Sequence, residues 1–572
     1  MRARSSVLAL LAALALALSA CGSGGGTKGD RAASGKSNQG GPSAEAIDIN
    51  ALPRDKVPDG GTLRWPITGI PPNFNYNQID GTLKDNAEVI EALMPGVFRF
   101  DAKAQPILNT DYASFADLTA TTPKQVVTYR LNPKATWSDG TPITVADFAA
   151  QAKALNGRNN AYKIASANGY EQIESVTQGK DDREVIVTFD RPYADWRALF
   201  DHVYPAATNN DPAVFNDGWK DKPLVTAGPF RWENLDRTAN TITLVRDDRW
   251  WGNRAKLDRI IYRDIDADAQ IDALANNEID FIDVGPDVNK LKRATSTAGV
   301  TIRRAGGPNF RQITINATSE VLKDVRVRKA LGLAINRKTI AKALLGPLGV
   351  AATPLGNHLF MTNQKGYRDN SGDLGSPSAE RARSLLDEAG WKLEGATRKK
   401  EGKELAIRFV IPTQVASSRQ ESELVQGMLA DVGVKVNIQP VPSDDFFDKY
   451  ITPGDYDFTV FSWIGTPFPI SSAKSIYVNP RPRPDGSLDV QQNYARVGSP
   501  EIDSLFDQAT AEFDGDKAIA LGNEIDTKIW DEVHSLTLYQ RPDIVAARST
   551  LANFGAFGFA TPPTYEDIGF TK

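Results

Sequence analysis

The chain has 572 residues and a mass of 62.2 kDa, and its 66 basic and 71 acidic side chains give a net charge of −5. This balance argues against nucleic acid as the main partner, because such binding relies on basic surfaces. With 41% hydrophobic and 24% charged residues, the composition is that of a soluble globular protein with several domain-sized units. Wholesale disorder and a polytopic membrane protein are excluded.

Cysteine and histidine are too sparse for the sites that depend on them. The chain has one cysteine, Cys21, and three histidines, His202, His358 and His534, which stand far apart in the sequence. A disulfide framework, a CxxC redox motif and a Cys/His zinc site are therefore excluded. We expect neither a resident metal ion nor an organic cofactor.

The N-terminal segment is typical of an export signal. Two early arginines precede an apolar stretch at 7–18, which is too short to span a bilayer core of roughly 30 Å. It ends in the run Leu-Ser-Ala-Cys at 18–21, which resembles a bacterial lipobox. The sequence thus predicts a cleaved signal peptide over 1–20 and a lipid-modified Cys21. Two or more acyl chains would hold the mature protein at the outer face of the bacterial cell membrane.

The segment 21–58 differs in composition from the rest of the chain. It is rich in Gly, Ser, Lys and Asn and has almost no apolar residue before Ile47. Such a segment cannot bury enough surface to fold. We expect a flexible tether, with an end-to-end distance of about 30 to 35 Å, that lets the folded body reorient above the membrane.

Beyond Gly61 the sequence alternates short β-branched or aromatic runs with segments of helical period. Predicted strands cover 62–65, 126–131, 185–189, 241–246, 259–262, 279–282, 312–316, 405–410, 435–441 and 458–463. Predicted helices cover 145–155, 267–276, 325–334, 337–345, 379–388, 419–431, 502–512 and 517–533. The alternation indicates an α/β or mixed α+β fold. No repeat of 20 to 50 residues is present, which disfavours solenoids and propellers.

A series of short motifs follows in one order along this body. The first is a strand, the turn Trp137-Ser138-Asp139-Gly140-Thr141-Pro142, and a helix capped by Thr144 with Asp147 at its third position. The others occupy 226–230, 249–252, 257–260, 277–281, 324–338, 385–391, 429–436 and 456–463. Each motif alone is weak evidence. Together, between about residues 60 and 548, they resemble the family 5 extracellular solute-binding proteins of ABC importers, the oligopeptide and dipeptide binding group.

The resemblance implies an α/β fold of the periplasmic-binding-protein type, with two hinged lobes that close over a solute. Lobe I is expected over 59–305 with an inserted subdomain at about 99–224, lobe II over 306–525, and a return to lobe I over 526–572. The implied function is to capture a solute, expected to be a short peptide, and to deliver it to an ABC permease. The receptor would act as a monomer and without a catalytic step.

The resemblance also points to ligand-binding residues in three segments. They are Trp463, Gly465 and Thr466, then Asn493 and Tyr494, and in the first lobe Phe74 and Asn75. Trp463 matches the aromatic residue that stacks on the solute in this family. Asn493 offers a donor and an acceptor to a solute backbone, and Tyr494 an amphipathic wall.

The segment after Trp463 departs from the family pattern. Gly465-Thr466-Pro467 occupies the place where peptide binders carry an aspartate that pairs with the peptide ammonium. Burying a cation without a carboxylate costs several kcal/mol. Either another acid, such as Asp445 or Asp485, replaces this aspartate, or the ligand has no free amine. Asp455 and Asp457 precede the strand and are expected to be turn residues.

Several other functions are weighed against this interpretation. A secreted hydrolase would need a catalytic motif, but the sequence has no GxSxG or HExxH, and paired carboxylates such as Asp181-Asp182 are usually solvated. The run 264–268 begins like a calcium loop, yet Ala269 and Ala275 stand where Gly and Glu belong. A non-peptide solute in the same fold, a metal chelate among them, and a surface sensor without transport remain open.

Overall fold

The computed structural model describes residues 47–101, 104–483, 486–560 and 565–571. The predicted signal peptide, Cys21, most of the tether and Asp485 lie outside these residues. Among the described helices, none combines the length and the apolar character that a membrane span requires.

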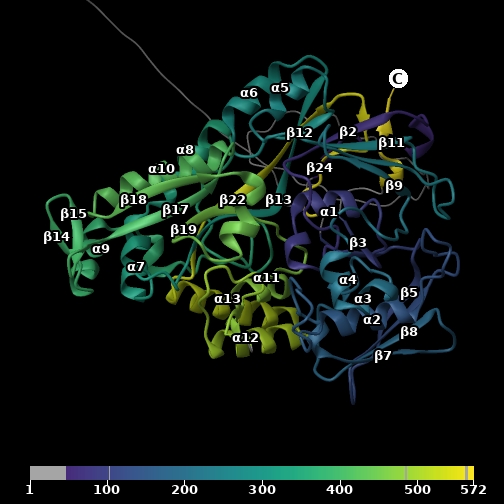
Figure 1. The fold of residues 1–572 in the computed structure, drawn as a ribbon, viewed down its shortest axis with the longest axis horizontal. Coiled ribbons are helices and arrows are strands. Elements are labelled where there is room, and N and C mark those ends of the chain that lie inside the picture. Colours follow the sequence, from purple (N-terminus) through teal and green to yellow (C-terminus); the bar gives the residue numbers. More distant parts are fainter. Residues whose placement is uncertain (1–46, 102–103, 484–485, 561–564, 572) are drawn as a thin grey trace, which may run out of the picture. The chain divides into compact units, whose positions relative to one another are not determined.

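Two four-stranded sheets dominate the first half of the chain (Figure 1). One has the order β2-β11-β10-β9, with β2 (Thr62–Ile67), β9 (Phe230–Asp236), β10 (Thr241–Arg246) and β11 (Arg259–Asp264). The other is antiparallel with the order β5-β6-β8-β7, from β5 (Ala113–Ala120), β6 (Val126–Leu131), β7 (Ile173–Gln178) and β8 (Glu184–Phe189). Every second residue of β6 and β8 is buried, because one face of this sheet packs on the core.

Short elements complete this half of the protein. Its helices are α1 (Lys84–Ile90), α2 (Val145–Leu155), α3 (Ala206–Asn209) and α4 (Pro212–Asp217). The short strands pair as β1 (Asp48–Ile49) with β24 (Gly555–Ala556), β3 (Phe98–Phe100) with β4 (Pro106–Leu108), and β23 (Leu551–Ala552) with β25 (Gly569–Phe570). Thr144 caps α2 in the predicted capping box with Asp147.

A six-stranded mixed sheet organises the second half. Its order is β12-β22-β13-β19-β17-β18, from β12 (Phe281–Asp283), β13 (Val300–Ile315), β17 (Ala406–Pro412), β18 (Lys435–Val441), β19 (Phe458–Trp463) and β22 (Ser535–Arg548). The helices are α5 (Gln270–Ala275), α6 (Val288–Ser296), α7 (Val325–Ala334), α8 (Arg337–Leu345), α9 (Ala379–Glu388), α10 (Ala416–Ala430), α11 (Pro469–Tyr477), α12 (Pro500–Ala511) and α13 (Gly515–Asp531). A small three-stranded sheet has the order β14 (Lys392–Glu394), β15 (Thr397–Lys400) and β16 (Lys403–Glu404). A separate two-stranded sheet pairs β20 (Arg481–Pro482) with β21 (Leu488–Asp489).

The buried apolar side chains form separate cores, and these cores define two lobes. Lobe I comprises the elements around the core that contains Trp65, Tyr129 and Trp196. Lobe II comprises the elements around two further cores, one under the six-stranded sheet and one among α11, α12 and α13. The predicted two-lobe α/β architecture is confirmed, while the residue boundaries given above stay predictions.

Two long antiparallel strands connect the lobes. β13 contributes Ala305 to the core of lobe I and Ile313 to that of lobe II. β22, paired along it, contributes Val545 to the first and Leu536 to the second. The register between the two strands shifts between Gly306 and Phe310. This irregular stretch lies next to the predicted lobe boundary at 305/306, and it is where a hinge would bend most easily.

Candidate functional site

The end of β19 borders a pocket beside this irregular stretch. The antiparallel pairing of β19 with β13 sets Trp463 opposite Phe310. The pocket is lined by residues of β13, of the segment 358–364, of the turn after β19 and of α11. They are Pro308, Phe310, His358, Leu359, Met361, Gln364, Ile464, Gly465, Thr466, Pro469, Ser472, Ala473 and Ile476. Its volume is about 30 Å³, room for a few non-hydrogen atoms.

Two of the predicted ligand-binding residues, Gly465 and Thr466, line this pocket. A Cβ atom on Gly465 would lie 2.3 Å from the carbonyl oxygen of Pro308, so only glycine allows this close approach. The Gly465 N–H also donates to Asn309 Oδ1 at 3.1 Å. The turn is thereby fixed against the strand that connects the lobes. Contact of Gly465 and Thr466 with a solute stays a prediction.

Trp463 and Tyr494 belong to an aromatic cluster next to the pocket. Their rings stack with centroids 5.8 Å apart and an interplanar angle of 13°, and Phe461 lies 5.2 Å from the Trp463 ring. Although the Trp463 indole N–H is buried, it donates no hydrogen bond to any of the described residues. Buried indole donors usually have a partner, so this one has unused capacity. Burial raises the pKa of Tyr494 to about 12, and its hydroxyl therefore stays neutral at physiological pH.

The Asn493 side chain is committed to the fold. Its amide donates to the carbonyl oxygens of Val478 and Val497, both at 2.7 Å. Its oxygen accepts from the Arg496 N–H at 2.9 Å and lies 3.0 Å from His534 Nε2. The residue has no exposed surface. Asn493 would have to exchange existing bonds in order to contact a solute.

The structure does not bring Phe74 and Asn75 to the pocket. Both are fully buried within lobe I. The Phe74 ring meets Trp232 edge to face at 5.0 Å. The Asn75 amide donates to the Phe215 carbonyl at 3.0 Å and its oxygen accepts from the Asn77 N–H at 3.1 Å. The loop that carries them is held by these internal contacts.

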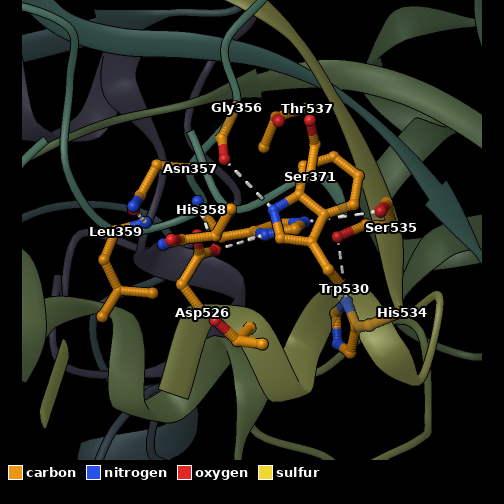
Figure 2. Close-up of polar contacts among 12 residues, drawn as sticks. Gly356, Asn357, His358, Leu359, Ser371, Asp526, Trp530, His534, Ser535 and Thr537 are labelled. Carbon is orange, nitrogen blue, oxygen red and sulfur yellow. Dashed lines mark hydrogen bonds and ion pairs between the residues drawn. The ribbon is translucent and has the colours of Figure 1, made fainter. Parts of the chain in front are cut away.

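A buried polar network supports the pocket wall at His358, as Figure 2 shows. His358 Nδ1 lies 2.7 Å from Asp526 Oδ1, and the same oxygen accepts from the His358 backbone N–H at 2.8 Å. The Trp530 indole donates to the Gly356 carbonyl at 3.3 Å. These bonds tie the loop at 356–358 to α13.

His534 joins the same network although it stands far from His358 in the sequence (Figure 2). Its Nδ1 lies 3.0 Å from the Ser535 hydroxyl, and the Ser535 carbonyl lies 3.4 Å from His358 Nε2. Burial, followed by the neighbouring His358 and Arg328, holds the pKa of His534 well below its usual range. No local sequence pattern predicts that these two histidines share one network.

Acidic residues lie around the site, although the pocket lining includes no Asp or Glu. Asp445, a candidate for holding an ammonium group, pairs with Lys449 at 2.7 Å. Asp455 pairs with Arg408 at 2.5 Å, and Asp457 accepts from the Arg408 N–H at 2.7 Å. The last two residues thus connect the start of β19 to Arg408 of β17.

Carboxylates of the two lobes also face one another. Burial, followed by the charges of Asp444, Asp85 and Asp266, raises the pKa of Asp264 to about 6. Asp444 belongs to lobe II, and its carboxylate would meet a Cβ atom placed on Gly69 at 2.9 Å. In the part of the chain that the structure describes, no three His, Cys, Asp or Glu side chains are grouped so that they could hold a metal ion.

Comparison with known proteins assigns the family. Residues 105–481 match the family described as bacterial extracellular solute-binding proteins, family 5 Middle. The chain is also 42% identical over 529 residues to the oligopeptide-binding protein OppA of Mycobacterium tuberculosis, covering 92% of this chain and 87% of that one. The chain therefore belongs to the family 5 bacterial extracellular solute-binding proteins, and the predicted resemblance is confirmed.

Solved structures agree with this fold. A periplasmic EDTA-binding protein, EppA, is 25% identical with a TM-score of 0.80, covering 92% of this chain and 98% of that one. The oligopeptide-binding protein AppA of Bacillus subtilis, solved with a nonapeptide, is 21% identical with a TM-score of 0.79, covering 90% of this chain and all of that one.

Proposed function

We propose that this protein captures short peptides between its two lobes and delivers them to an ABC permease. The observation that carries the proposal is the 42% identity, over 92% of the chain, to proteins named as oligopeptide-binding. The family binds solutes, so the site needs no chemical step. Its work is to stabilise one arrangement of the lobes when solute is present.

The geometry beside β19 suits a peptide ligand. A peptide exposes backbone carbonyl groups that require donors, and the buried Trp463 indole N–H is a donor with unused capacity. The adjoining pocket is lined mainly by apolar side chains and would take a small apolar group. Without an acid in this lining, the peptide ammonium must be held elsewhere in the cleft.

The donor role of Trp463 can be tested without removing its ring. Trp463→Phe deletes the indole N–H and keeps an aromatic side chain, so we expect affinity for the best binder in a tripeptide panel to fall about tenfold. Isothermal titration calorimetry gives the affinity. Trp391→Phe is the matched control, because Trp391 is equally buried in lobe II but belongs to the core under the six-stranded sheet, not to the core that contains Trp463 and the pocket residue Phe310. Equal affinities of the Trp463→Phe variant and the unmodified protein would refute this role.

We also propose that Cys21 is the lipidated N-terminus of the mature receptor, which acts as a monomer. The lipobox-like run at 18–21 and the polar segment after it support this assignment. In cell fractionation we expect the Cys21→Ser protein to be absent from the membrane pellet. The Ser23→Ala protein, changed in the same stretch, should remain in that pellet. If the Cys21→Ser protein still sedimented with the membrane, another anchor would have to be sought.

A further inference from the structure

An ionic contact joins the two lobes away from the strands that connect them. The ammonium of Lys474, on α11 of lobe II, contacts the carboxylate of Glu171 in lobe I. The same ammonium lies 2.9 Å from Asp507 Oδ1, on α12 of lobe II. Only 5% of Lys474 is exposed, so its charge depends on these two partners.

Two further charges repeat the pattern across the same boundary. Arg191 of lobe I lies 3.6 Å from Asp507 of lobe II. In the other direction, Arg481 of lobe II lies 3.9 Å from Glu171 of lobe I. Asp507 therefore faces one cation from each lobe, whereas Glu171 faces two cations of lobe II. Separation of the lobes would break one cationic contact of Asp507 and both contacts of Glu171.

Uncharged hydrogen bonds strengthen this boundary. The Ala194 N–H of lobe I donates to the Thr510 carbonyl of α12 at 2.7 Å. The Asn168 amide of lobe I donates to the Ser471 carbonyl of α11. Backbone groups on both sides are used, so the contact depends on the positions of the helices as well as on their side chains.

The helix α11 takes part in both this boundary and the pocket. Ser471 and Lys474, three residues apart, contact lobe I. Ser472, Ala473 and Ile476, on other sides of the helix, line the pocket. A solute in the pocket would therefore press on the helix that holds the lobes together.

We propose that Asn168, Glu171, Ala194, Lys474, Asp507 and Thr510 form a latch that holds the lobes closed and slows solute release. The part about release rests on the proposed function, whereas closure can be measured without any solute. Lys474 is the central residue, because its loss leaves Glu171 and Asp507 as facing like charges. Opening lets water solvate both acids, so this loss destabilises the closed arrangement selectively.

The test uses the mature chain with Cys21→Ser, so that no native cysteine competes for labels. Spin labels at Lys153→Cys on α2 and Glu524→Cys on α13, both exposed positions, report the distance between the lobes by pulsed electron paramagnetic resonance. In the solute-free protein, Lys474→Met should add a population at longer distance. We expect release of a bound tripeptide, followed by stopped flow, to become about tenfold faster.

Two further variants separate the latch from a general loss of stability. Lys528→Met removes an ammonium that lies 2.9 Å from Glu501, within lobe II, and should leave the distance distribution unchanged. Adding Glu171→Gln to Lys474→Met removes the facing charges and should restore part of the closed population. A misfolded variant would not be rescued in this way.

The outcomes distinguish the latch from the proposed ligand. A longer distance in Lys474→Met supports the latch even if no peptide binds. A distance distribution equal to that of the parent protein, in a variant that still binds tripeptide, would overturn the latch and leave the proposed function standing.

Discussion

Glu566 shows how burial changes the pKa of a single carboxylate. It is 2% exposed in lobe I, and its Oε1 lies 3.6 Å from an Arg99 guanidinium nitrogen. Burial raises its pKa to about 7, against the opposing effect of Arg99. The pKa in the unfolded chain is about 4.3, so folding favours the protonated form. The stability that this proton supplies is present below about pH 4 and is lost as the pH rises through 7.

This predicted loss of stability with rising pH can be tested by mutation. Glu566→Gln resembles the protonated acid at every pH, so we expect similar unfolding free energies of the two proteins at pH 4 and a more stable variant at pH 8. The difference at pH 8 has an upper bound of about 4 kcal/mol. Urea denaturation at both pH values measures it. Glu423→Gln, at an exposed position on α10, serves as the control. If the Glu566→Gln variant kept the pH dependence of the parent, Glu566 would not be the group responsible.

Single residues of the site could be predicted only in part. Gly465 and Thr466 line the pocket because they follow directly after a strand whose position the sequence predicts well. Asn493 and Asn75 are internal, because their hydrogen-bond partners are set by the tertiary fold. The His358 and Asp526 pair joins residues 168 positions apart, and no local pattern marks it.

At the scale of elements, regular local patterns predicted the fold closely. The predicted ranges 325–334, 337–345 and 379–388 coincide with α7, α8 and α9, and 458–463 coincides with β19. In α9 a capping Ser378 and a clear apolar period define the helix. These segments carry strong signals of their own.

The missed elements are those that tertiary contacts define. The sequence predicts β13 only over 312–316, because Gly306-Gly307-Pro308 is typical of a turn. The strand in fact extends from Val300 to Ile315 and contains these residues as an irregularity. β22 is almost continuously buried and contains Pro542, so no alternation marks it. The Ser-rich helix α11 lacks a clear period. The full course of these strands and the proposed latch therefore could not be predicted from local sequence patterns, although the predicted lobe boundary at 305/306 falls within β13.

For the whole molecule, the closed arrangement is a balance of opposing contacts between the lobes. At one boundary the Lys474 ammonium attracts the carboxylates of Glu171 and Asp507. The carboxylates of Asp264 and Asp444 repel at another. A solute shifts this balance only through contacts that it makes better in the closed arrangement. The lobes can respond because β13 and β22 connect them through an irregular stretch.

Native mass spectrometry of the purified protein would show whether the solute is a short peptide. The mature chain would be purified without refolding, measured intact, then denatured so that any released compound can be identified. We expect a heterogeneous set of short peptides, bound one per chain. A single non-peptide compound in the same stoichiometry would contradict the peptide assignment.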